Sequence, residues 1–406
     1  MNIGKISKKK LLSGLVFCIS PIAGLIVLLH KINRDSFNLL YILLSLFFAL
    51  MVLKNPPLYD LIRYLELFDS SGVSIGLELH NYLSFQIISS IFKILDIPFY
   101  FLPSLFVFFF IYFHLKAIGV VYDYYNWSIK KQLILIFGLV ILLNPIFAST
   151  VLRSFLASGL FMYGTFLIIF SEKKRGYLYV GMSILFHLSF AYLVLFFLVS
   201  RVIKIEKTVA FIVSCFAITI SLVFISYLID LIPFELVKIQ FSNYLTDNNT
   251  GADAGAGNFQ AVIINCIIVL THILLCLIYF LTRIPKAEKA FEYSNLVNFM
   301  IIAGSLSSIS FTVFTRFFSH ISLFTFVYIM IFIIFISKNK IVSFALSLIL
   351  LVNFLLIDVY IRKDSLLNGS PIAMVTVTPL QIFLYSDMEY REMLKNINYH
   401  GDIIND

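Results

Sequence analysis

Apolar runs of about 17–25 residues recur along the whole chain, and short polar stretches separate them. Each run is long enough to cross a hydrocarbon layer of about 30 Å as a helix. Candidate spans lie at 11–30, 37–53, 98–116, 132–150, 152–171, 208–231, 259–282, 296–314, 318–337 and 341–360. With two further segments described next, the pattern predicts an all-α, polytopic transmembrane bundle of about 10–12 spans.

Two segments depart from this simple pattern. Residues 78–96 mix polar and apolar side chains at helical spacing, which predicts an amphipathic helix at the membrane interface or lining a cavity. Residues 177–200 are apolar, with His187 near their centre. They can cross the membrane once, or fold back as two half-helices around His187.

The basic residues decide part of the topology. Stretches 172–176, 201–207, 283–289 and 338–340 are rich in Lys and Arg, and such loops stay in the cytoplasm. If all four are inside, 177–200 is a re-entrant segment, with His187 approached from the outer side. The loop 232–258 is then a longer exoplasmic loop, and the helix ends that carry Arg153 and Arg316 face outward.

The N-terminal charges conflict with this topology. Four lysines within the first ten residues favour a cytoplasmic start. Two complete spans, 11–30 and 37–53, would then leave 54–80 on the cytoplasmic side. This holds unless 78–96 is a full span; with 78–96 at the interface, 54–80 lies outside but the lysines are exported. We place 54–80 outside, because its polar residues otherwise have no partners on the outer face.

Composition agrees with a membrane protein. Of 406 residues, 60% are hydrophobic and 13% charged, and the mean hydropathy is +0.97. We expect one membrane domain at 1–362 and a polar tail at 363–406 with a short surface helix. The net charge of +8 does not indicate nucleic-acid binding, because the basic residues lie in inter-helix loops. The sequence has no P-loop, HExxH, CxxC or DxD motif, so we expect no cofactor and no metal.

Two arginines lie beside apolar runs, where ionisable groups are rare and usually functional. Arg153 begins the predicted helix 152–171, and a face of small residues follows it: Ser154, Ala157, Ser158 and Gly159. Such a face predicts close helix packing. Arg316 repeats the arrangement, with His320 four residues later. Two arginines on one side suggest a shared anionic ligand; alternatively each pairs with an acid, or Arg153 only extends to the interface.

Two further groups are candidates for chemistry. Asp60, Arg63 and Tyr64 follow the spacing i, i+3 and i+4, so they share one face of a helical turn. They can hold a sugar hydroxyl, with Asp60 as a base, or they can form an ordinary surface salt bridge. His187 is either a structural histidine or a general base in an outer cavity.

The stretches "NPIFASTVLRSFLASGLFMYG" and "SEKKRGYLYVGMSILFHLSFAYLVLFFL" resemble the EpsG family of bacterial polysaccharide polymerases, related in role to the Wzy polymerases. The matching residues include Arg153, the basic turn at 173–175 and His187. Asp60 and Tyr64 match an upstream loop of the family, and Arg316 matches a later arginine.

The resemblance implies a metal-independent glycosyltransferase in the bacterial cytoplasmic (inner) membrane. It would join undecaprenyl-pyrophosphate-linked oligosaccharide repeat units into O-antigen, capsule or exopolysaccharide at the outer face. Arg153 and Arg316 would stabilise the pyrophosphate, with His320 beside them. His187 would be the base and Asp60 its competitor, while Arg63 and Tyr64 orient the acceptor sugar. A flippase and a chain-length regulator would be its partners.

Two other functions use the same residues. A flippase or transporter for lipid-linked oligosaccharide would grip pyrophosphate without breaking a bond. An O-acyltransferase of surface glycans would use His187 as its base.

Overall fold

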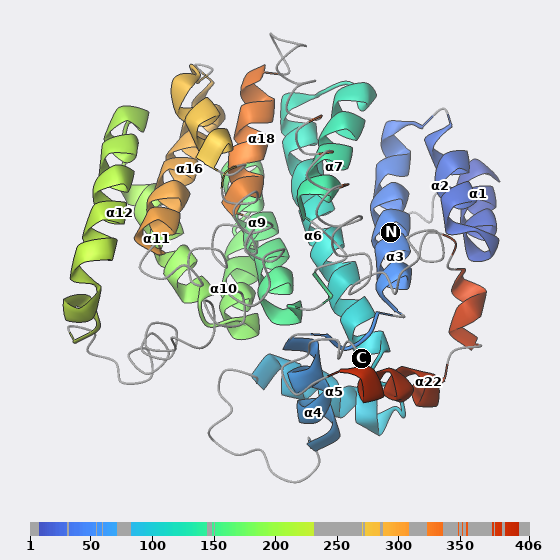
Figure 1. Cartoon of the computed structure of the whole chain (residues 1–406). Helices are drawn as coiled ribbons and strands as arrows, with labels where there is room; N and C mark the ends of the chain where they lie inside the picture. Colours follow the sequence, from blue (N-terminus) through green and yellow to red (C-terminus); the bar gives the residue numbers. More distant parts are fainter. Residues whose placement is uncertain are drawn as a thin grey trace. The chain divides into compact units, whose positions relative to one another are not determined.

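The computed structural model describes residues 8–30, 32–53, 55–58, 60–70, 83–143, 148–149, 151–230, 273–284, 287–307, 323–335, 378–383 and 386–397, together with a few single positions. The described residues form helices and no strand (Figure 1). The predicted all-α membrane bundle is therefore confirmed. Contacts divide the chain into two compact units, one of residues 1–190 and 350–406 and one of residues 191–349.

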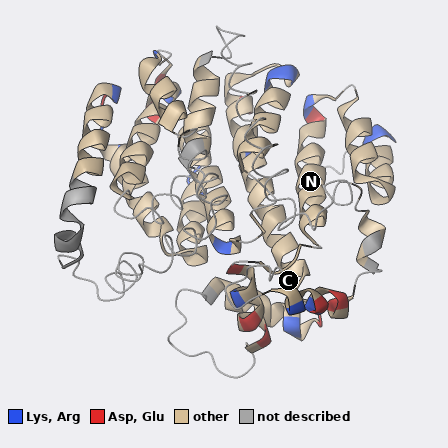
Figure 2. Cartoon of the chain, viewed as in Figure 1, with Lys and Arg blue, Asp and Glu red and all other residues tan. Residues whose placement is uncertain are grey.

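Three described helices are long and apolar enough to cross a membrane: Arg34–Val52, Phe101–Tyr125 and Leu152–Ser171. The first contains α3 (Phe37–Val52), and the others are α6 and α9. The predicted span at 152–171 has the bounds of α9. In Figure 2 these long helices are tan along most of their length, as helices facing lipid or other apolar helices must be.

The predicted first span at 11–30 is wrong. It forms two short helices, α1 (Lys8–Ile19) and α2 (Pro21–Leu29). Ser20 accepts a hydrogen bond from Ala23 N and caps α2, and Pro21 occupies the first turn, where its missing N–H does no harm. The chain reverses direction there, as the hydrogen bond from Ser13 Oγ of α1 to Gly24 O of α2 at 2.8 Å shows.

This hairpin removes the conflict at the N-terminus. Lys9 hydrogen-bonds to His30 O, and Lys10 Nζ donates to Asp35 O at 2.8 Å. The lysines of α1 and the start of α3 therefore lie at one end of the bundle. Helix α3 then runs from this end to the segment at 55–70. The lysines and that segment therefore lie at opposite ends of the bundle.

The order of contacts along α6 gives the directions of its neighbours. Phe37 of α3 packs on Tyr122 near the end of α6, at 5.5 Å between ring centroids, so α3 and α6 are antiparallel. Helix α9 runs parallel to α6, since Phe110 packs on Phe155 near its start and Tyr124 on Phe170 near its end. The starts of α6 and α9 therefore share one end with the end of α3.

Small residues let α9 pack closely, as its sequence predicted. A Cβ on Gly159 would lie 3.0 Å from Phe110 O of α6. A Cβ on Gly164 would lie 2.6 Å from the carbonyl oxygen of Gly176, the first residue of α10 (Gly176–Phe186). Nearly all of α9 is buried, including its small-residue face.

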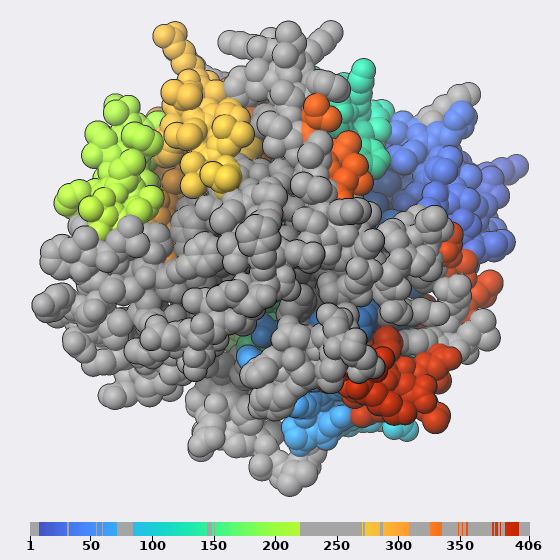
Figure 3. Space-filling view, viewed as in Figure 1, coloured from blue at the N-terminus to red at the C-terminus, as the bar shows by residue number. Residues whose placement is uncertain are grey.

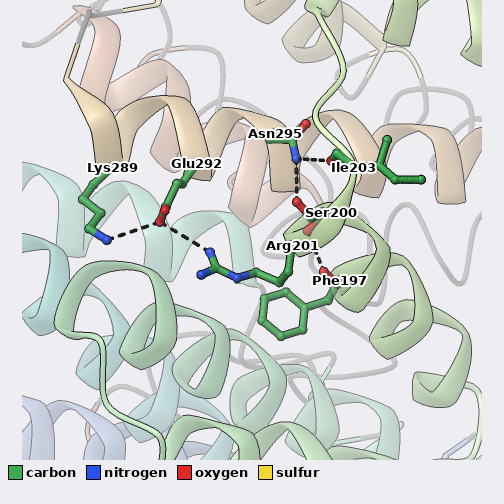
Figure 4. Close-up of polar contacts among 7 residues, drawn as sticks. All are labelled: Phe197, Ser200, Arg201, Ile203, Lys289, Glu292 and Asn295. Atoms are coloured by element: carbon green, nitrogen blue, oxygen red, sulfur yellow. Dashed lines mark hydrogen bonds and ion pairs between the residues drawn. The ribbon is translucent and has the colours of Figure 1, made fainter.

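The second unit contains most of α11 (Phe190–Val202), with α12 (Lys207–Asp230), helical residues 273–281, α16 (Glu288–Leu306) and α18 (Leu323–Phe335). Polar side chains of α16 hold the loop after α11 (Figure 4). Asn295 Nδ2 donates to Ser200 O and Ile203 O, while Glu292 accepts from Arg201 and Lys289. The basic stretches 201–207 and 283–289 thus lie at one end of the unit, as a shared side of the membrane requires.

The segment 177–200 is divided at His187, while its folding back as a re-entrant segment stays a prediction. Helix α10 ends at Phe186 and α11 begins at Phe190, and His187 has extended backbone with φ −151° and ψ 113°. The amphipathic pattern of 78–96 appears as α5 (Leu83–Ile94). Most of the spans predicted at 259–282 and 341–360, and the loop 232–258, lie outside the described residues.

Candidate functional site

Arg153 is the second residue of α9, and its side chain is buried, with 8% of its surface exposed. Its Nε donates a hydrogen bond of 3.1 Å to the hydroxyl of Tyr64, and its guanidinium carbon lies 5.7 Å from the centre of the Tyr64 ring. Tyr64 belongs to α4 (Asp60–Ser70) and is itself buried. The bond is made by one of the five N–H donors of the guanidinium, a planar group whose geometry matches phosphate oxygens.

A row of aromatic rings extends from Tyr64 towards the end of α10. Tyr64 packs on Phe85 of α5 at 4.8 Å between centroids, Phe85 on Phe106 of α6 at 6.4 Å, and Phe106 on Phe186 at 6.2 Å. Phe85 and Phe106 are fully buried, so the row is rigidly packed. It joins the helix that carries Tyr64 to the residue just before His187.

His187 therefore lies at the same end of the first unit as Arg153. It follows the last residue of α10, and its Nδ1 is 2.6 Å from Ser189 Oγ. Its side chain is half-buried, unlike that of a fully enclosed structural histidine. Because α10 ends here, the imidazole sits in a break between helices, where irregular backbone is tolerated only beside protein or a polar cavity.

Asp60 and Arg63 of α4 pair with each other at 3.6 Å between Oδ1 and Nη1. The Arg63 side chain is 61% exposed, and Asp60 is half-buried. Tyr64 instead contacts Arg153 in the interior. The three residues predicted to share one face therefore do not share one set of partners. An exposed pair of this kind contributes about 0–1 kcal/mol to stability, and the roles assigned to Asp60 and Arg63 stay predictions.

Asn55 and Ser149 form a contact that the sequence did not indicate. Asn55 Nδ2 donates to Ser149 Oγ at 3.1 Å, and both side chains are buried. Asn55 lies between α3 and α4, while Ser149 precedes α9. The bond therefore ties the approach to α4 to the approach to α9, the two helices that carry Tyr64 and Arg153. The one signal for it was a polar residue before Pro56 and Pro57 at the end of an apolar run.

Arg316 and His320 lie outside the described residues, so a shared ligand with Arg153 stays a prediction. The same holds for the polar residues of 78–82, which precede α5. Within the described ranges, no group of three or more His, Cys, Asp and Glu side chains comes together.

Two electrostatic features favour an anion at the start of α9. The N-terminus of a helix carries a partial positive charge and unbonded N–H groups, and Val151 at the N-cap provides no side-chain acceptor for them. The guanidinium of Arg153 adds a full charge at the same place. Nearby α4 and α5, with α22 (Asp387–Glu392), carry a cluster of acidic and basic side chains (Figure 2).

No curated protein and no solved structure matches the chain. The sequence does match the EpsG family over residues 36–370, a range that contains Asp60, Tyr64, Arg153, His187 and Arg316. Because this match covers far more than half of the sequence, the chain belongs to the EpsG family, which consists of Wzy-like polysaccharide polymerases.

Proposed function

We propose that the protein joins undecaprenyl-pyrophosphate-linked oligosaccharide repeat units at the outer face of the bacterial cytoplasmic membrane, as a multi-pass enzyme. The product would be an O-antigen, a capsule or an exopolysaccharide. The observation that carries the proposal is the buried Arg153, held by Tyr64 at the start of α9 within the matched range of a polymerase family.

In the proposed reaction, a hydroxyl oxygen of one repeat unit attacks the anomeric carbon of another. The bond between that carbon and the pyrophosphate oxygen breaks, and the lipid pyrophosphate leaves with the bonding electrons. The acceptor proton passes to a base. Negative charge therefore develops on the pyrophosphate. A positioned guanidinium stabilises this charge more in the transition state than in the bound substrate.

The geometry supports a role for each of two residues. Arg153 would hold the pyrophosphate with its guanidinium, a planar group of donors that matches phosphate oxygens and keeps its charge when buried. His187 would take the proton. When the imidazole carries its own proton on Nδ1 and donates it to Ser189, Nε2 is the unprotonated nitrogen that can act as base.

The test is the glycan made by a strain that carries Arg153→Ala. We expect single repeat units and no long chains, with normal amounts of inserted protein. Arg153→Lys should also be impaired, because an ammonium group cannot form the planar fork. Arg201→Ala is a matched control, since it removes an arginine paired with Glu292 in the second unit. Long chains of normal length from Arg153→Ala would refute the site.

The same strain distinguishes the two other functions. A flippase mutant leaves lipid-linked repeat units on the cytoplasmic side, and tolerates His187→Ala better than Arg153→Ala. An acyltransferase mutant leaves full-length polymer that lacks acyl groups. A polymerase mutant leaves single repeat units that have already crossed the membrane.

A further inference from the structure

The segment 386–397 packs against the part of the first unit that contains Tyr64. It contains α22 and the short helix η8 (Met393–Asn396). Tyr390 is 1% exposed and packs on Phe99 and Tyr100, at 6.0 and 5.9 Å between ring centroids. In Figure 3 the dark red atoms of this segment lie next to the light blue atoms of α5. The segment follows residue 370, where the match to the family ends.

Arg391 joins this segment to α4. Its Nη1 and Nη2 donate to the two carboxylate oxygens of Asp69, each at 2.9 Å, and its Nε donates to Asp387 at 2.6 Å. This is the paired geometry in which arginine and carboxylate bind most strongly. The two carboxylates also raise the pKa of Arg391 above its usual range, so the group keeps its charge at any physiological pH.

The local sequence prepares Arg391 for this contact. Ser386 caps α22 by accepting from Glu389 N, and Glu389 accepts from Ser386 N in return. This capping box fixes the start of a helix that is only six residues long. Asp387 then holds Arg391 one turn later, so the guanidinium is already oriented towards Asp69.

Asp69 lies near the end of α4, and that end is held from two sides. The Asp69 carboxylate binds Arg391, and its carbonyl oxygen accepts from Lys93 Nζ of α5 at 2.9 Å. Tyr64 lies five residues earlier, or about 7.5 Å along the helix axis. A helix of eleven residues is not stable by itself, so packing must fix the direction of α4 and of Tyr64.

We propose that the segment 386–397 is a clamp on α4 and that Arg391 is a positioning residue for the Tyr64–Arg153 contact. The clamp acts through Asp69 and through Tyr390, and it keeps the Tyr64 hydroxyl at the Nε of Arg153. This rests on the proposed function in one respect, because Arg153 is taken to bind the lipid pyrophosphate. The clamp itself is a structural property that needs no turnover to be measured.

The first experiment measures the clamp directly by amide hydrogen exchange of the full-length protein in detergent. Arg391→Ala should speed exchange in residues 60–70 by about twofold to fivefold, the range that a partly exposed ion pair supports. Asp387→Ala keeps the two bonds to Asp69 and should change exchange less. Arg201→Ala removes an ion pair of the second unit and should leave 60–70 unchanged.

The second experiment measures polymerisation. The substrate is the lipid-linked repeat unit extracted from a strain that lacks this protein. Arg391→Ala should raise KM by about twofold to fivefold and leave kcat within about twofold, because it loosens a binding group and removes no reacting one. Asp69→Ala should have the same effect, and the double variant should be no worse than either, since both remove one interaction.

Each outcome decides the proposal. Unchanged exchange in 60–70 for Arg391→Ala overturns the clamp. Faster exchange with an unchanged KM overturns the positioning role and leaves the clamp. Additive effects of Asp69→Ala and Arg391→Ala show that the two residues act separately, which also overturns it. If the wild-type protein makes no polymer, the proposed function fails, while exchange still reports whether the clamp exists.

Discussion

The hydrogen bond between Tyr64 and Arg153 can be removed by a substitution that keeps the Tyr64 ring. Tyr64→Phe takes away one hydroxyl and keeps the ring, so the contact with Phe85 at 4.8 Å and the position of the ring near the guanidinium are retained. The variant therefore removes the 3.1 Å bond and keeps the packing of the ring.

The size of the effect follows from burial. Both side chains are buried, with 5% of Tyr64 and 8% of Arg153 exposed, so water does not replace the lost acceptor. A hydrogen bond to a charged group contributes about 1.5–3 kcal/mol, and 1.4 kcal/mol is a factor of ten in rate or binding. If the bond holds Arg153 at the pyrophosphate, kcat/KM should fall by about 10- to 100-fold.

The assay is the initial rate of chain growth by purified protein on extracted lipid-linked repeat units. Tyr293→Phe is a matched control, because Tyr293 is equally buried and its hydroxyl donates to Phe326 O in the second unit. It should lower thermal stability modestly and leave kcat/KM within about twofold. A Tyr64→Phe enzyme that keeps normal kcat/KM, while Arg153→Ala is inactive, would refute the role given to this bond.

Three other predictions follow from the structure. His187→Ala should lower the polymerisation rate by about 10²- to 10⁴-fold, the usual contribution of a general base, and a rate within threefold of wild type would exclude His187. Gly164→Ala should lower the free energy of unfolding in detergent by about 1–3 kcal/mol, because its Cβ would lie 2.6 Å from Gly176 O, whereas Gly181→Ala has nothing within 4 Å and should not. In a variant without native cysteines, Met388→Cys should react with a membrane-impermeant thiol reagent in intact cells, since Met388 is 72% exposed on the segment that contacts α4; labelling only after lysis would place that segment in the cytoplasm.

Local patterns predicted the features that depend on neighbouring residues. Helix α9 was predicted with its bounds, because an arginine marks its start and the basic turn 172–176 its end. A break at His187 was part of one of two alternatives for 177–200; the structure shows the break, and the fold-back itself stays a prediction. The hairpin at Ser20 and Pro21 was missed, although a serine before a proline is an N-terminal helix signal. The prediction of a single span followed instead the length of the apolar run, which matched that of a membrane-crossing helix.

Contacts between distant residues were beyond the sequence. Arg153 and Tyr64 are 89 positions apart, and Arg391 and Asp69 are 322 apart. Both arginines were visible as charges, but no periodicity shows which acceptor each one meets. Tyr64 was assigned to a sugar because it shares a turn with Asp60 and Arg63. Its burial gives it a different neighbour, and burial depends on where α4 packs.

The directions of the helices in the first unit place its lysine-rich stretches at one end. The lysines of α1 lie at the end where α3 begins, and α6, which is antiparallel to α3, ends there. Lys130 and Lys131 follow α6, and the basic turn 172–176 follows α9, which is parallel to α6. All these basic groups therefore gather at one end, which the positive-inside rule assigns to the cytoplasm. Arg153 and α4 lie at the other end. That arrangement depends on the hairpin of α1 and α2, because a single helix at 11–30 would move the lysines to the side of Arg153.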